Sequence, residues 1–172
     1  MAAASSAERI EGVDFAERTR VADASLPLRG VGLLVYRWVI KGYVAALYLP
    51  ADVPSTQVLS DVPKRLELEY FWQIDGADFG PAAESIMQRQ FDARTLAPLR
   101  DRIELLHAAY RDVEPGDRYV LEYVPGNGTT LSLNGEEIIA TPGADFAAVY
   151  FAVWLGSDPI DTSLRRQLLE ME

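Results

Sequence analysis

The sequence predicts an α+β fold in which a large, mostly antiparallel sheet is covered on one face by a layer of helices. Three observations lead to this prediction. Runs rich in β-branched and aromatic residues recur over 10–72. Closely spaced turn signals, Asn134-Gly135 the strongest of them, divide 117–141 into a three-stranded meander. Segments with helical periodicity lie between and after these strands, and one of them is apolar on every side.

The N-terminal half supplies the first strands. Residues 1–9 are expected to form a flexible lead, and 10–172 a single domain. The segments with the β pattern are 10–21, 28–40, 43–49 and 66–72. Within the second of them, Gly30 and Gly32 indicate a bulge or the close approach of another backbone. Lys41-Gly42 is expected to turn the chain into the third strand, which Pro50 ends.

The helical layer is assigned to three segments: 81–91, 95–112 and 144–155. Pro81 suits a first helical turn, and Thr95 is a plausible N-cap. The third helix has no polar face, so it must be buried on several sides, and Gly156 is expected to end it. A closing amphipathic helix is expected to be capped by Thr162 or Ser163.

Composition excludes several classes of function. The 172-residue chain has no cysteine, which rules out disulfides, thiolate metal sites and cysteine nucleophiles. Because His107 is the one histidine, sites that need two imidazoles are ruled out, and it is interpreted as a structural or surface residue rather than a general base. The formal charge of −10 argues against nucleic acid as a partner. We therefore expect no cofactor and no metal.

Other features bear on location and on alternative sites. No apolar run reaches the length of a membrane span, and 1–6 do not form an intact signal peptide. We expect a soluble protein, and the periplasm and the cytoplasm both remain open, as does the oligomeric state. Glu67 and Glu69 share one strand face and would suit a hard cation, but a solvated sheet face is favoured. The pair Gly30-Val-Gly32 lacks the third glycine and βαβ unit of a dinucleotide loop.

The order of these elements resembles the chalcone isomerase-like family, with its bacterial members most similar at the C-terminal half. The resemblance covers about 10–170, and its shared order carries more weight than any single piece. The local stretches that carry it are Ile10-Glu-Gly-Val-Asp-Phe, Leu28-Arg-Gly-Val-Gly-Leu-Leu, Tyr43-Val-Ala-Ala-Leu-Tyr-Leu, Pro63-Lys-Arg-Leu-Glu-Leu, Pro115-Gly-Asp, Gly128-Thr129, Asn134-Gly135 and Val153-Trp-Leu-Gly-Ser-Asp-Pro. The resemblance implies an open-faced β-sandwich with a ligand cleft between sheet and helices.

The enzymes of this family use an arginine just past the glycine pair to steer a phenolate and stabilise the developing enolate. The resemblance places that position on Leu34, or on Val35 if the alignment shifts by one residue. It places the family's threonine on Tyr43 and its polar residue near the end of the buried helix on Val153. None of these residues matches the enzyme pattern, and neither Leu34 nor Val35 can donate a hydrogen bond.

We therefore expect a non-catalytic family member that binds a hydrophobic small molecule, such as a fatty acid or a flavonoid-like compound. Arg37 is the nearest possible substitute for the missing arginine, although a solvated strand residue is the alternative. The expected ligand-binding residues are Arg37, Tyr36, Tyr43 and Trp38. The alternative function is an isomerase or intramolecular lyase of the chalcone isomerase type on an unknown substrate. In that case Arg37 and a nearby tyrosine, Tyr36 or Tyr43, would supply the polar groups. A purely structural role, without a cavity, is a third possibility.

Overall fold

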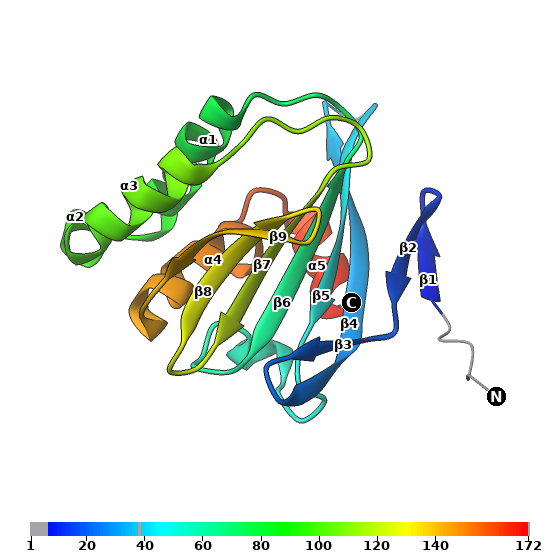
Figure 1. Ribbon diagram of the computed structural model, residues 1–172, viewed down its shortest axis with the longest axis horizontal. Coiled ribbons are helices and arrows are strands. Elements are labelled where there is room, and N and C mark those ends of the chain that lie inside the picture. Colours follow the sequence, from blue (N-terminus) through cyan, green and yellow to red (C-terminus); the bar gives the residue numbers. More distant parts are fainter. Residues whose placement is uncertain (1–6, 38, 172) are drawn as a thin grey trace.

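The computed structural model describes residues 7–37 and 39–171. Its centre is a strongly curled, seven-stranded antiparallel sheet in which each strand pairs with its neighbour in the sequence (Figure 1). The strands of this sheet, in order, are β3 (Arg18–Val21), β4 (Ala24–Tyr36), β5 (Ile40–Tyr48), β6 (Lys64–Tyr70), β7 (Arg118–Val124), β8 (Gly128–Leu133) and β9 (Glu136–Thr141). A separate hairpin of β1 (Ala7–Ile10) and β2 (Val13–Ala16) precedes it.

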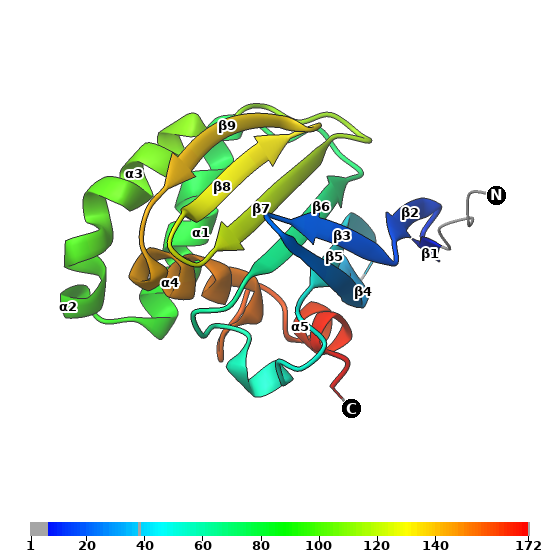
Figure 2. The same cartoon turned by 60° about the horizontal axis from the view of Figure 1, so that its bottom comes forward.

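The helices gather on one face of the sheet. In the rotated view of Figure 2, α4 and α5 lie beneath the strands. Their bounds are α1 (Gly76–Gln90), α2 (Ala93–Leu96), α3 (Arg100–Ala109), α4 (Ala144–Leu155) and α5 (Thr162–Leu169), with 3₁₀ turns η1 (Ser55–Gln57) and η2 (Ala97–Leu99). This arrangement confirms the predicted α+β fold class. No helix within 7–37 and 39–171 has both the length and the apolar character that a membrane span needs.

The sheet separates two apolar cores because side chains alternate along each strand. On β5, Tyr43 and Leu47 point toward the helices and belong to the larger core, which includes the fully buried Phe151 of α4. Val44 and Tyr48 point the other way, into a smaller core beneath the N-terminal hairpin. The large core is therefore the one that lies between sheet and helices, where the resemblance places a ligand cleft.

Gly30 and Gly32 allow α5 to lie directly against β4. A Cβ atom on Gly30 would meet the backbone oxygen of Gln167 and would lie 2.7 Å from that of Leu168. A Cβ atom on Gly32 would lie 2.7 Å from a side-chain methyl of Leu164. The side chain of Gln167 then accepts a hydrogen bond from the backbone N–H of Leu33 at 3.1 Å. The close backbone approach predicted at this glycine pair is present, and α5 is the element that makes it.

Several strand boundaries differ from the prediction. The single edge strand expected over 10–21 is divided among β1, β2 and β3, because Glu11 and Gly12 adopt positive φ and turn the chain back on itself. The predicted turn at Lys41-Gly42 is wrong as well. The strand ends at Tyr36, Arg37 takes a φ of 50°, and Lys41 already pairs with Val35 inside the sheet.

The helical boundaries also differ. Helix α1 begins at Gly76, five residues before the predicted start, so Pro81 lies inside the helix rather than at its first turn. Pro81 is exposed, so water can bond the carbonyl that the proline leaves unpaired. The helix expected over 95–112 is interrupted, because Pro98 falls in the 3₁₀ turn η2 between α2 and α3.

The observed caps are aspartates. Asp92 accepts a hydrogen bond from the N–H of Thr95, and Asp161 accepts one from the N–H of Leu164 at 2.6 Å. The predicted caps Thr95 and Thr162 or Ser163 are therefore wrong. Gly156 does follow α4, but its φ of −78° is not left-handed. Its small size is needed instead because a Cβ atom there would lie 2.7 Å from the backbone oxygen of Ala152.

A candidate ligand-binding cavity between sheet and helices

A cavity of about 230 Å³ lies between the helix-facing side of the sheet and the layer formed by α1, α4 and the end of α3. Its lining is apolar and aromatic, and consists of Tyr43, Leu68, Tyr70, Ile74, Asp78, Phe79, Ala82, Ala83, Tyr110, Tyr119, Leu121, Leu131, Val153, Trp154 and Ile160. Asp78 and Ala82 are also exposed to solvent, so the cavity opens beside α1. An apolar hollow with few polar groups is the usual form of a small-molecule site.

Two of the tyrosine hydroxyls around the cavity form hydrogen bonds with neighbouring groups in its wall. The hydroxyl of Tyr119 donates to the backbone carbonyl of Arg111 and accepts from the N–H of the same residue, both at 2.7 Å. The hydroxyl of Tyr110 is paired with that of Tyr150 at 2.9 Å. These bonds tie the segment that leaves α3 to the sheet and to α4, and so they hold the wall of the cavity in place.

The other two tyrosine hydroxyls have unused capacity. Tyr43 accepts a hydrogen bond from the indole N–H of Trp154 at 3.1 Å, which leaves its own proton free to donate. Tyr70 is 4% exposed, and its hydroxyl makes no hydrogen bond with any residue in the described part of the chain. Burial raises the pKa of both phenols well above the ordinary value, so both remain protonated donors at neutral pH.

Aromatic packing fixes the direction of the Tyr70 ring. Its centroid lies 5.3 Å from that of Tyr43, 5.6 Å from that of Phe79 and 6.1 Å from that of Tyr119. The last two contacts are edge-to-face, the arrangement that aromatic quadrupoles favour. The Tyr70 hydroxyl is therefore held on a rigid support rather than on a loop.

The three positions that the resemblance matched to the family's active site lie on the side of the sheet that faces this cavity. Tyr43 and Val153 line it, from β5 and α4 respectively. Leu34 pairs directly with Tyr43 across β4 and β5, and its side chain packs against the same large core. The structure thus brings together residues that are more than a hundred positions apart in the sequence.

The remaining predicted residues lie elsewhere. Arg37 and Tyr36 are exposed at the tip of the β4–β5 hairpin, and the Arg37 guanidinium lies 5.2 Å from the centre of the Tyr36 ring. Neither residue lines the cavity. Val35, the alternative to Leu34, is also exposed. Trp38 lies outside the described residues.

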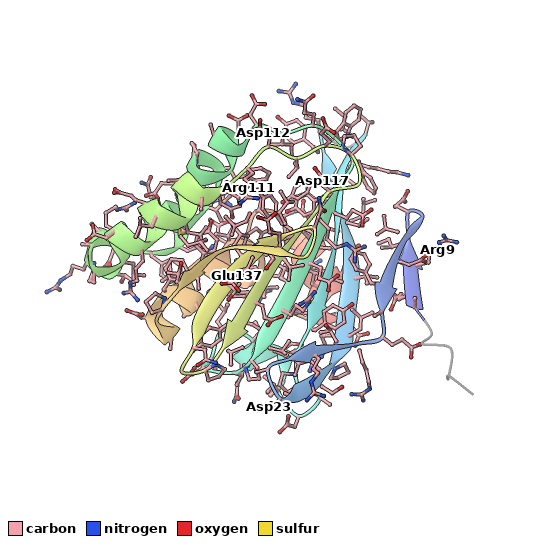
Figure 3. All side chains as sticks on the ribbon, viewed as in Figure 1. Arg9, Asp23, Arg111, Asp112, Asp117 and Glu137 are labelled. Atoms are coloured by element: carbon pink, nitrogen blue, oxygen red, sulfur yellow. The ribbon has the colours of Figure 1, made fainter. Side chains whose placement is uncertain are left out.

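The acidic pair considered for a cation occupies the opposite face of the sheet. Arg118 binds Glu67 at 2.9 Å and Glu69 at 2.6 Å, while Arg65 joins Glu67 to Glu122. The carboxylates are therefore engaged in ion pairs rather than held together for a metal. The ion-paired residues share this outer face with Glu137 of β9. Figure 3 shows Glu137 in front of the strands.

Several lining residues were not among the predicted ligand-binding residues, and two kinds of signal pointed to them. Tyr70 and Tyr119 continue the apolar alternation of β6 and β7, so each falls on the buried side of its strand. Phe79 and Ala83 share one face of α1 at a spacing of four, but the predicted helix began at Pro81 and so excluded Phe79.

His107 lies outside the cavity, and burial lowers the pKa of its imidazole.

Comparisons with known proteins agree with this architecture. A family model described as chalcone isomerase-like matches residues 7–170. Among solved structures, a fatty-acid binding protein from Arabidopsis thaliana superposes with a TM-score of 0.68, covering 96% of this chain and 96% of that one. The sequence identity is 15%, so this likeness concerns the fold. No curated protein sequence gives a significant match.

Proposed function

Since the chain belongs to the chalcone isomerase-like family, we propose that it is a non-catalytic member that binds a hydrophobic small molecule in the cavity between the sheet and α1, α3 and α4. One observation carries the proposal. Two of the positions that the resemblance matches to the family's active site, Tyr43 and Val153, line a preformed hollow that is almost entirely apolar. Burying apolar ligand surface there is favourable at about 25 cal/mol per Å².

The absence of a catalytic cation from the lining argues for binding rather than turnover. Ring closure of a chalcone type requires stabilisation of a developing enolate, for which a guanidinium is well suited. The position that the resemblance assigns to that arginine is Leu34, and Arg37 points from the hairpin tip without reaching the cavity lining. The described lining residues include no lysine or arginine.

The ligand classes considered first are fatty acids and flavonoid-like compounds. Fatty-acid binding by the Arabidopsis protein of the same fold supports the first, and the activity of the family's enzymes supports the second. Both classes bring the apolar surface that this lining would bury.

The test is binding to delipidated protein, measured by calorimetry and by the rise in Tm, against a panel of fatty acids of graded length, flavonoids and neutral single-ring aromatic compounds. A ligand at a hundred times its Kd should stabilise the folded state by about 2.7 kcal/mol. A turnover assay with naringenin chalcone in parallel would detect the isomerase alternative. Failure of every compound to bind saturably would contradict the proposal.

Two matched variants test whether the ligand binds in this cavity. Ala83→Leu adds bulk to the lining from the buried side of α1, and it should abolish binding while the protein stays folded. Ala77→Leu adds the same bulk on the exposed side of the same helix and should bind as the wild type does. Equal binding by both variants would mean that the ligand site lies elsewhere.

A further inference from the structure

The charges around the cavity are unfavourable for an anionic ligand. Among the described residues that line it, the one charged side chain is Asp78, which lies at the mouth and is negative. Arginines on α3 lie close by, but they are already paired. Arg100 binds Glu84 through two contacts at 3.0 Å, and Arg102 binds Asp145 at 2.8 Å and 2.9 Å.

The buried lysine of the sheet is also occupied. Lys64 donates to the backbone carbonyl of Ser60 at 2.8 Å and lies over the rings of Tyr123 and Phe151. It does not line the cavity. A carboxylate that entered the hollow would lose its hydration and meet no described cation, and such a transfer is strongly unfavourable for an ion.

A neutral oxygen acceptor meets different conditions. The Tyr70 side chain lines the cavity and is held by three aromatic neighbours, and its hydroxyl has no partner among the described residues, so a bound acceptor can take a hydrogen bond that the protein itself leaves unused. The Tyr43 proton is a second available donor, on a ring whose centre lies 5.3 Å from that of Tyr70. A carbonyl group accepts from one or two donors and carries no charge, so it matches this pair.

We propose that the cavity selects a neutral, carbonyl-bearing apolar ligand, with Tyr70 as the donor to its oxygen, and discriminates against free carboxylates. This inference rests on the proposed function, because it specifies the ligand class of the same cavity. Ketones, aldehydes and esters belong to this class, whereas ionised fatty acids do not.

The volume of the cavity narrows the class further. An apolar cavity of about 150 Å³ holds a benzene molecule, whereas sites for drug-sized ligands start at about 300 Å³. At about 230 Å³ this hollow fits one ring with a short side chain, or a short aliphatic chain. Two-ring chalcones and long-chain fatty acids exceed this volume, so they would have to extend through the mouth beside α1 or displace the lining.

Three compounds of nearly equal shape test the proposal on the full-length chain. They are 4-phenylbutan-2-one, the corresponding acid 3-phenylpropanoate, in which an oxygen anion replaces the methyl group, and butylbenzene, which lacks the carbonyl. We expect the ketone to bind about fivefold more tightly than the hydrocarbon, the usual contribution of one hydrogen bond, and at least tenfold more tightly than the carboxylate at pH 7.5.

The variant Tyr70→Phe isolates the donor. The Tyr70 hydroxyl makes no bond with the described residues, so its removal should leave the fold and the affinity for butylbenzene unchanged and should remove most of the ketone's advantage. Tyr36→Phe, an exposed tyrosine outside the cavity, is the matched control and should bind as the wild type does.

The outcomes separate the two proposals. If butylbenzene binds but the carboxylate binds as tightly as the ketone, or the ketone's advantage survives in Tyr70→Phe, the inference is overturned while the proposed function stands. If none of the three compounds binds, both proposals fail.

Discussion

Lys64 is the buried cation of this molecule and lies between an aromatic pair. Its ammonium is 4.8 Å from the centre of the Tyr123 ring and 5.5 Å from that of Phe151, and it donates to the carbonyl of Ser60. Burial lowers the pKa of Lys64 to about 8, and the nearby carboxylate of Asp61 opposes that shift. The folded state therefore favours the neutral amine more than the unfolded chain does.

This shift predicts a pH dependence of stability. Below pH 8 the folded state carries the full cost of a buried charge, and that cost is relieved as the pH rises from 8 toward the unfolded value of 10.5. Between pH 7 and 9.5 the wild type should gain roughly 2 kcal/mol relative to Lys64→Met, which cannot titrate. Urea unfolding of both proteins at the two pH values measures the difference. Parallel pH curves for the two proteins would contradict the assigned pKa.

At the residue scale, the sequence best placed those cavity-lining residues that lie in a clear strand or an apolar helix. Tyr43 and Val153 fall in well-defined elements, so matching them to family positions was enough to bring them to the cavity. Arg37 could not be placed, because its direction depends on where the hairpin turns. A positive φ at Arg37 ends the strand alternation at that point.

At the scale of elements, the contact of α5 with β4 depends on the absence of two side chains. We expect Gly30→Ala to destabilise the protein by about 1–3 kcal/mol, since its Cβ would press on the backbone of α5, which cannot move aside as a side chain can. Gly42→Ala is the matched control on the neighbouring strand. Its Cβ would meet a movable methyl of Leu34 at 3.0 Å, so its effect should stay within about 0.5 kcal/mol. Equal losses in chemical denaturation would show that the backbone contact is unimportant.

The start of α5 gives a second prediction. Asp161→Ala removes the acceptor for the N–H of Leu164, so it should cost about 1 kcal/mol of unfolding free energy. Thr162→Ala, one residue further on, changes an exposed side chain and should cost less than about 0.5 kcal/mol. Thermal unfolding of the two variants side by side distinguishes them. A larger loss of unfolding free energy in Thr162→Ala would support Thr162 as the cap, as predicted from the sequence.

Element boundaries were less predictable than element types, and the reasons differ. Aspartate, serine and threonine are all good caps, so a run such as Asp161-Thr-Ser offers several starts that only the tertiary fold decides between. Pro81 suggested a helix start because proline is common there, yet α1 accommodates it on its exposed side. Local propensity therefore fixed the presence of each helix and left its ends to packing.

At the scale of the whole molecule, the sheet was predictable because its order follows the chain and its turns carry strong signals. The cavity was not, because its walls come from four strands, two helices and connecting segments that are distant in sequence. Periodicity assigns Tyr70, Phe79 and Trp154 each to a buried face. It does not show that their faces leave a gap between them.

The dependence of the whole fold on its last helix can be measured. A chain ending at Asp161 loses the buried Leu164, Leu168 and Leu169, each of which contributes about 1.5–3 kcal/mol. That sum is comparable to the entire stability of an ordinary domain, so the shortened chain should show no cooperative thermal transition. A chain ending at Glu170 retains α5 and should unfold cooperatively. Cooperative unfolding of both chains would show that α5 is dispensable.

The order of strands in the sheet has a consequence for how the protein is made. As the chain leaves the ribosome, each strand from β4 to β9 finds its hydrogen-bonding neighbour already synthesised. The glycine-lined surface of β4 has no such partner, because the Gln167 side chain that binds Leu33 is 134 residues away. At usual rates of synthesis that interval lasts on the order of ten seconds. A nascent chain therefore exposes this strand surface until its final helix emerges.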